Sequence, residues 1–127
     1  MPQFDKKKFV DYLNKHTTGL YGEGKCATHV RKAIEAAGLN PVGHPIDAKD
    51  WGPTLIRLGF TIISNDNYTP MLGDIAVIQQ TSTSKPGHIE GYDGTHWVSD
   101  FVQPQGFWPG PIYRLEKPSY AIYRWNL

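Results

Sequence analysis

The stretch 26–38, CATHVRKAIEAAG, is the part of the sequence that most directly predicts the fold. On a helical wheel its small and apolar residues form one stripe, its charged residues lie opposite, and Gly38 is placed to end the helix. The segment before it, 18–25, contains Gly19, Gly22 and Gly24, which is typical of a loop. We therefore expect a loop that leads into an amphipathic helix, with Cys26 in the first turn and facing the body of the protein.

Helical patterns also occur on both sides of this stretch. Residues 4–16 place apolar side chains on one face and lysines outside, and residues 53–58 form a shorter apolar pattern that ends at Gly59. The periodicity then changes to short runs rich in β-branched and aromatic residues, which predict strands over 60–63, 74–80, 88–92, 96–102 and 120–125. This order predicts an α+β fold in which N-terminal helices pack on an antiparallel sheet.

The overall composition narrows the class of protein. The 127 residues suit a single domain that spans 1–127, because no repeat or linker divides them. A formal net charge of +1 gives no field that favours nucleic acid, and no apolar run is long enough for membrane insertion. The start, MPQFDKKKF, lacks the apolar centre of a secretory signal, so we expect a protein made in the cytoplasm without a signal peptide. One cysteine excludes an intrachain disulfide and nearly every metal motif built on several cysteines.

The single cysteine has a chemical interpretation. A thiol with a pKa of about 8.5 needs a factor that favours the thiolate, and a helix start supplies one through its dipole and its unpaired N–H groups. His88 and Asp100 lie on neighbouring expected strands joined by the Asp93-Gly94 turn, which brings them to opposing or nearly opposing positions. Cys26 as nucleophile, His88 as base and Asp100 as the group that orients the ring form a plausible catalytic set.

Other residues offer alternatives or additions to this set. Glu90, two residues after His88 on the same strand face, is able to replace Asp100 as orienting group, and His96 is a second candidate ring partner or base. His29 follows Cys26 by three residues, but two ligands without a second pair make a weak metal site, so we expect none. The aromatic-rich stretch 101–113 is expected as a loop packed over the sheet, or alternatively as one wall of a substrate groove.

Candidate substrate-binding residues follow from the same segments. Gly24 carries no side chain that would block a substrate backbone, Tyr21 is able to place a hydroxyl near the thiol, and Trp108 offers an aromatic face in the 101–113 stretch. These three residues are the candidate substrate contacts, and packing within the fold is the alternative role for Tyr21 and Trp108.

These residues resemble a known family. The helix start Gly24-Lys25-Cys26-Ala27, the strand LGDIAVI (72–78), Gly87-His88-Ile89 and the run WVSDF (97–101) are similar to the papain-like cell-wall amidases of the NlpC and CHAP type. The resemblance implies a papain-like fold and hydrolysis of amide bonds in the peptide stems of peptidoglycan. It also implies Cys26 as nucleophile, His88 as base and acid, and Asp100 as the orienting residue, with no cofactor.

A compact chain with no leader looks most similar to the type VI secretion amidase effectors within this superfamily. That resemblance implies an antibacterial toxin, action in the periplasm or cell wall of a target bacterium after non-classical delivery, and a cognate immunity protein as partner. A phage lytic enzyme of the same chemistry is the nearby alternative. Two further hypotheses are a catalytically silent module that binds glycan or peptide, and a deamidase or protease that acts on proteins.

Overall fold

The computed structural model describes residues 3–17 and 25–126, and their secondary structure follows the expected order. Helices come first and most of the sheet follows. The elements are α1 (Lys6–Lys15), α2 (Cys26–Ala36), η1 (Ala48–Asp50), α3 (Gly52–Leu58), β1 (Thr61–Ile63), β2 (Ile75–Ile78), β3 (His88–Tyr92), β4 (Trp97–Val98), α4 (Pro111–Glu116) and β5 (Tyr120–Arg124).

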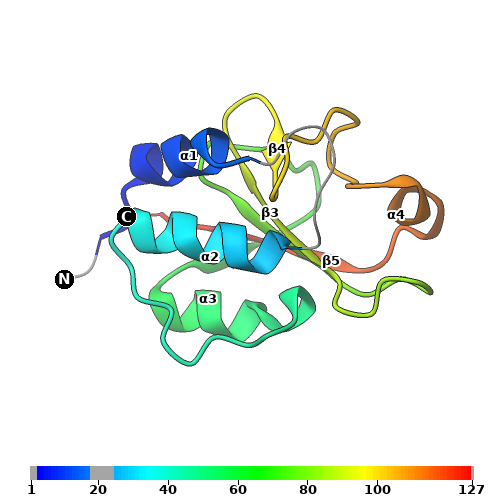
Figure 1. Cartoon of the computed structure of the whole chain (residues 1–127), viewed down its shortest axis with the longest axis horizontal. Coiled ribbons are helices and arrows are strands. Elements are labelled where there is room, and N and C mark those ends of the chain that lie inside the picture. Colours follow the sequence, from blue (N-terminus) through cyan, green and yellow to red (C-terminus); the bar gives the residue numbers. More distant parts are fainter. Residues whose placement is uncertain (1–2, 18–24, 127) are drawn as a thin grey trace.

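The strands form one antiparallel sheet in the order β1-β5-β2-β3-β4 (Figure 1). The last strand in sequence, β5, lies between β1 and β2, so residues 120–124 form an interior strand of the sheet. In the central β2–β3 pair, Ile78 lies opposite His88 and Ala76 lies opposite Glu90. This register places His88 and Glu90 on the same face of β3, two residues apart.

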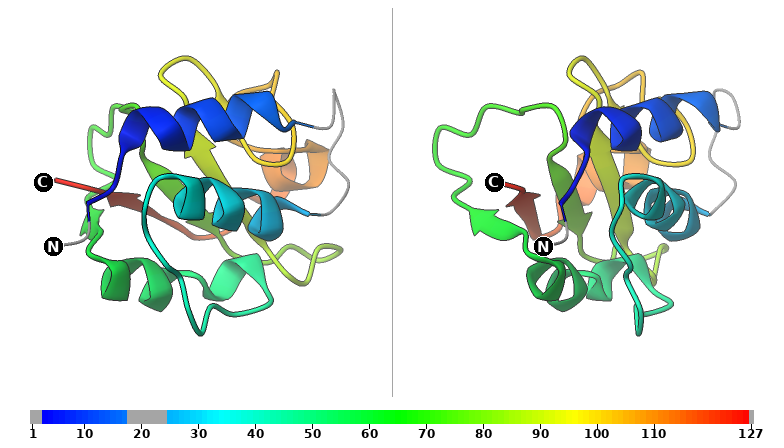
Figure 2. Two further views of the ribbon diagram at one scale, coloured as in Figure 1. Left: turned by 60° about the vertical axis from the view of Figure 1, so that its left-hand side comes forward. Right: turned by 90° about the vertical axis from the view of Figure 1, so that its left-hand side faces the viewer.

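The N-terminal helices α1 and α2 lie side by side on one face of this sheet (Figure 2), and α3 contacts β1 and β5. Gly91 of β3 allows α1 to approach the sheet closely, because a Cβ at this position would lie 2.7 Å from Phe9 and 2.8 Å from Leu13. The core between the layers combines the buried faces of the helices with alternate strand residues such as Ile75, Val77 and Ile89. The predicted α+β fold, with N-terminal helices on an antiparallel sheet, is therefore confirmed.

The opposite face of the sheet carries a smaller aromatic cluster. Buried Trp97, Ala76 and Ile122 contact the partly buried rings of Phe107 and Tyr120. Phe107 lies edge-on to Trp97 with 5.3 Å between the ring centroids, so the chain after β4 folds back over this face. No helix within residues 3–17 or 25–126 has the length and apolar character needed to cross a bilayer.

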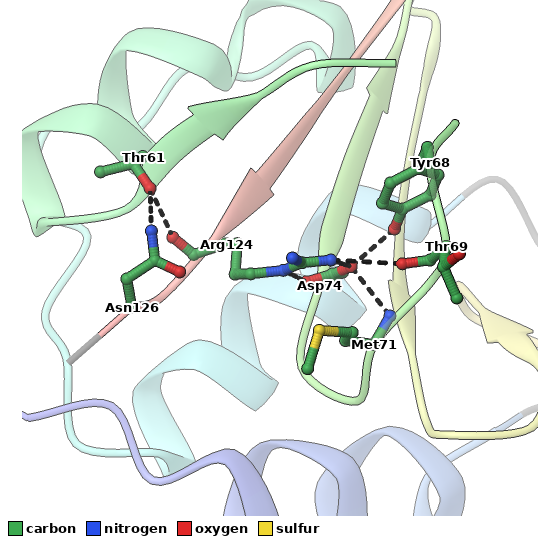
Figure 3. Close-up of polar contacts among 7 residues, drawn as sticks. All are labelled: Thr61, Tyr68, Thr69, Met71, Asp74, Arg124 and Asn126. Atoms are coloured by element: carbon green, nitrogen blue, oxygen red, sulfur yellow. Dashed lines mark hydrogen bonds and ion pairs between the residues drawn. The ribbon is translucent and has the colours of Figure 1, made fainter. Parts of the chain in front are cut away.

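A buried carboxylate holds the long connection between β1 and β2 (Figure 3). Both oxygens of Asp74, which lies just before β2, accept hydrogen bonds at 2.8 Å from the Arg124 guanidinium on β5. The same carboxylate accepts the Tyr68 hydroxyl at 2.6 Å and the Met71 backbone N–H at 3.0 Å. Asp74 therefore ties the 68–71 segment to the middle of the sheet.

Two sequence-based expectations need correction. The strand expected over 96–102 is only Trp97–Val98, because the chain turns back at 99–101 and Val102 forms an isolated bridge with Val98. Asp100 therefore lies in this turn and not on a strand opposite His88. The stretch 101–113, expected as a loop, contains the start of α4, which begins at Pro111. Proline suits the first turn of a helix, because its missing N–H would have no partner there.

Candidate active site

Cys26 is the first residue of α2 and faces the protein body as expected. The preceding residue, Lys25, caps the helix, and its backbone N–H donates to the Asp100 carboxylate at 3.1 Å. The first helical turn contains no acidic side chain. The unpaired N–H groups and the positive end of the helix dipole lie at this turn, where they favour a negative charge on the thiol. No carboxylate within the turn competes for them.

His88 enters the site at the first position of β3 because of the glycine before it. Gly87 has φ of +72°, and a Cβ there would lie 2.5 Å from the Ile78 carbonyl oxygen and 2.7 Å from Cβ of Lys49. A side chain at position 87 would therefore disturb both the backbone and the packing. In this position the His88 ring hydrogen-bonds the Cys26 thiol, so the helix start and the head of β3 meet at one point.

The far side of the His88 ring has two oxygen neighbours. Nε2 lies 2.9 Å from Oε1 of Gln103 and 3.2 Å from Oε1 of Glu90. The Gln103 amide nitrogen donates to the backbone carbonyls of Gly106 and Phe107, at 2.9 Å and 3.2 Å. The amide oxygen must then face the ring as an acceptor, so Nε2 carries the proton. Nδ1 is thereby the ring nitrogen left to receive a proton from Cys26.

The electrostatics of the three groups are coupled. Burial of the Cys26 thiol opposes its ionisation, but the hydrogen bond to His88, the charge of that ring and the Ile89 backbone bring the thiol pKa below its ordinary value. Burial of His88 alone would lower its pKa, but its contacts with Cys26 and Glu90 outweigh burial and raise the pKa to about 10. Both directions favour a thiolate paired with an imidazolium.

A groove of about 840 Å³ leads to this pair. Cys26, His88 and Asp100 all line it, and its opposite wall comes from the chain between Phe101 and Arg114. Figure 1 shows α2 beginning at the side of the molecule where α4 lies, and both the first residue of α2 and residues of α4 line the groove. The wall is rich in ring-bearing residues, namely Phe101, Pro104, Trp108, Pro109, Pro111 and Tyr113.

The expected site residues divide into three groups. Trp108 lines the groove, as does most of the 101–113 stretch, whereas Phe107 of that stretch packs on the sheet. Tyr21 and Gly24 lie outside the described residues. Glu90 lies beneath the ring as its position on β3 predicted, but His96 is exposed in the turn between β3 and β4 and does not line the groove. Asp100 lines the groove and holds the Lys25 N–H, and its orienting role stays a prediction.

His29 is held against the end of α1. The ring is buried, and its Nε2 lies 3.0 Å from the Leu13 carbonyl oxygen at the end of α1. Burial lowers the pKa of His29, which favours the neutral ring as a donor to that carbonyl. Within the described part of the chain, no three His, Cys, Asp or Glu residues are grouped to hold a metal ion.

Gln103 is the site residue that the sequence analysis missed. It reaches His88 because the 99–101 turn reverses the chain, and its own backbone N–H then bonds the Trp97 carbonyl at 2.9 Å. The run WVSDFV reads as a continuing strand, so the pattern gave no sign of this reversal. The available signal was Gln103 itself, one of two glutamines that flank Pro104 in an aromatic-rich stretch.

Comparison with solved structures places this geometry among known proteins. The chain is similar to the crystal structure of the native type VI effector–immunity complex Tae3–Tai3 from Ralstonia pickettii, with 39% identity and a TM-score of 0.87 over 97% of this chain and 100% of the matched one. The selenomethionine form of that complex matches at 41% identity and a TM-score of 0.82, over 91% and 98% of the two chains. The chain matches no protein-family model, and no curated protein matches it.

The architecture and this likeness define the class as a papain-like α+β protein. In this chain that fold carries a thiol at a helix start hydrogen-bonded to an imidazole at the head of a strand. With 39% identity over nearly the whole of both chains, the protein belongs to the family of Tae3, a type VI effector.

Proposed function

We propose that this protein is an antibacterial type VI effector that hydrolyses amide bonds in the peptide stems of peptidoglycan, with Cys26 as nucleophile and His88 as base and acid. The observation that carries the proposal is the hydrogen bond between the Cys26 thiol and the His88 ring inside a groove of about 840 Å³. Membership of the Tae3 family supports the delivery route, and the resemblance to cell-wall amidases supports the substrate class.

The reaction follows from the geometry of the pair. The Cys26 proton moves to Nδ1 of His88, and the sulfur attacks the carbonyl carbon of the stem amide. Backbone N–H groups at the start of α2 hold the developing oxyanion. His88 then gives its proton to the leaving amine as the C–N bond breaks, and a thioester remains. A water molecule, deprotonated by His88, attacks the thioester and releases the new carboxylate and the thiol.

The third residue of the site has two candidates with different contacts. Gln103 accepts the Nε2 proton of His88 and is itself fixed by two backbone carbonyls, which supports an orienting role. Asp100 accepts the Lys25 N–H one residue before the nucleophile, which supports a role in holding the helix start. In this proposal Gln103 orients the ring and Asp100 positions Cys26.

The proposal extends to a partner and to a place of action. Both similar crystal structures are complexes of an effector with an immunity protein. We propose that this chain likewise has a cognate immunity protein, which protects kin cells, and that it acts on the wall of the bacterium that receives it. A groove with an aromatic wall is a suitable surface for both a stem peptide and an inhibitor.

Digestion of purified peptidoglycan sacculi, with the products identified by mass, tests the proposed function. Wild-type protein is expected to release stem fragments, and Cys26→Ala is expected to release none while keeping the wild-type thermal unfolding curve. Gln103→Leu and Asp100→Asn are compared in the same assay. The variant that releases stem fragments more slowly identifies the residue that contributes more to catalysis. An active Cys26→Ala protein overturns the mechanism. Tight binding of sacculi without any product from the wild type shows a binding module instead.

A further inference from the structure

Glu90 is a buried acid that the proposed reaction does not use. Its side chain is fully buried on β3, opposite Ala76 and beside the aromatic cluster on that face of the sheet. Neither carboxyl oxygen has a well-aligned hydrogen bond among the residues that the structure describes. Its one charged contact there is Nε2 of His88, at 3.2 Å, and that N–H is directed at Gln103.

A buried carboxylate without a well-aligned donor is costly, because it has lost water and its remaining contacts replace that water only in part. A positive ring at 3.2 Å removes most of this cost, whereas a neutral ring removes little of it. Ionisation of Glu90 and protonation of His88 are therefore linked, so that each charged form favours the other. The ring can obtain its proton from Cys26, which lies on its other side.

We propose that Glu90 is a positioning residue whose carboxylate holds the His88 ring in its imidazolium form and thereby sets the pH range in which Cys26 is a thiolate. The inference rests on the proposed pairing of Cys26 with His88 but not on the identity of the substrate. Burial raises the pKa of Glu90 to about 7, against the opposing pull of the His88 ring, so this acid changes its charge near neutral pH.

The proton balance of this arrangement is simple. As the pH rises, Glu90 loses its proton to solvent and keeps its electron pair beside Nε2–H. The Cys26 proton then moves to Nδ1, and the ring carries a positive charge between two negative groups. The carboxylate stabilises the imidazolium more than it repels the thiolate, because the ring lies between Glu90 and Cys26.

Other charged or titratable groups near the site act more weakly on Glu90. His88 is the titratable group in contact with it on β3. Gln103, from the segment after β4, does not titrate, and its hydrogen bond lowers the pKa of Glu90 less than the contact with His88 does. Tyr113 of α4 and Cys26 of α2 lie within electrostatic reach of the site, and Asp100 acts on Cys26. On β2, the residue opposite is Ala76, and the nearest acid along that strand, Asp74, is paired with Arg124.

The test measures alkylation of Cys26 by iodoacetamide as a function of pH. Because the chain has one cysteine, the rate reports on this thiol alone and needs no substrate. Glu90→Gln keeps the shape of the side chain and removes its charge. We expect this variant to react about tenfold more slowly near pH 7, with its apparent thiol pKa raised by about one unit. Glu35→Gln, which removes an exposed acid from α2, is the matched control and is expected to follow the wild type.

The outcomes separate this inference from the proposed function. A wild-type thiol that reacts no faster than free cysteine at slightly acidic pH contradicts both. If the wild-type thiol is reactive and Glu90→Gln shows the same dependence of alkylation rate on pH, only the role of Glu90 is contradicted. If Glu90→Gln does not fold, ¹³C NMR of the Glu90 carboxyl group in the wild type replaces it. There we expect a titration near neutral pH that coincides with a change at the His88 ring, and a titration at an ordinary glutamate pKa overturns the inference.

Discussion

Two buried carboxylates on the same face of the sheet have opposite surroundings. Asp74, before β2, receives hydrogen bonds from a guanidinium, a hydroxyl and a backbone N–H (Figure 3). Glu90, on β3, has a single charged neighbour, and within the described chain its oxygens have no well-aligned donor. The number of donors around each acid separates a structural carboxylate from one placed to respond to an imidazole.

The surroundings also determine what each acid does to its neighbours. Burial and the contact with Asp74 raise the pKa of the Tyr68 hydroxyl, so that hydroxyl remains a donor to the carboxylate at any physiological pH. The pKa of Glu90 is itself raised into the neutral range. We conclude that the Asp74 network holds the fold in one state, whereas the Glu90 site has two states that differ by one proton.

The largest expected effect is on stability, from Asp74→Asn. The substitution removes the charge that pairs with Arg124 and two of its acceptor positions, and Arg124 is only 21% exposed. Loss of one partner from a buried ion pair costs about 3 kcal/mol of unfolding free energy. Urea unfolding is expected to show a lower midpoint with an unchanged slope. Alkylation of Cys26 in the folded variant is expected to match the wild type. A loss below about 1 kcal/mol contradicts the structural role of this network.

The second prediction concerns the stability of Glu90→Gln, the amide substitution at the other buried acid. The folded-state pKa of Glu90 lies near 7, above its value in the unfolded chain of about 4.3. Its contribution to stability is therefore complete below about pH 4.3 and is lost as the pH rises toward 7. Glu90→Gln does not lose it, so we expect the variant to be more stable than the wild type above pH 7.

Thermal unfolding between pH 4.5 and 8 checks this prediction. The difference between Glu90→Gln and the wild type is expected to shrink to near zero at the acidic end and to grow through the neutral range. A constant difference at all pH values, or a variant less stable than the wild type at pH 8, shows that Glu90 is a satisfied structural acid like Asp74.

The sequence predicted the parts of this comparison that depend on periodicity. The stripe of 26–38 placed Cys26 in the first turn of α2, and the period of two on β3 placed Glu90 on the face of His88. The α+β fold followed from the order of the helical and strand patterns. These features are local, because each depends on residues within a few positions of one another.

The parts that depend on chain reversal were not predictable in the same way. The turn at 99–101 removes Asp100 from the expected strand and brings Gln103 to His88, although the residues there continue a strand-like alternation. What ends β4 is tertiary packing, since Trp97 and Phe107 pack edge to face across the returning chain. The donors around Asp74 likewise come from residues 68, 71 and 124, and no local pattern joins them.

The smallest expected effect distinguishes a satisfied hydroxyl from an unsatisfied one. Tyr68→Phe removes the donor at 2.6 Å from Asp74 and is expected to cost about 1 kcal/mol. Ser99 lies in the turn after β4, and its hydroxyl is fully buried with no hydrogen-bond partner in the part of the chain that the structure describes. Ser99→Ala therefore removes a group that has lost water without gaining a bond, and we expect a free energy of unfolding within about 0.5 kcal/mol of the wild type.

Urea unfolding of Tyr68→Phe and Ser99→Ala measures the difference. A loss at Ser99→Ala as large as that at Tyr68→Phe means that the serine hydroxyl has a hydrogen-bond partner in solution.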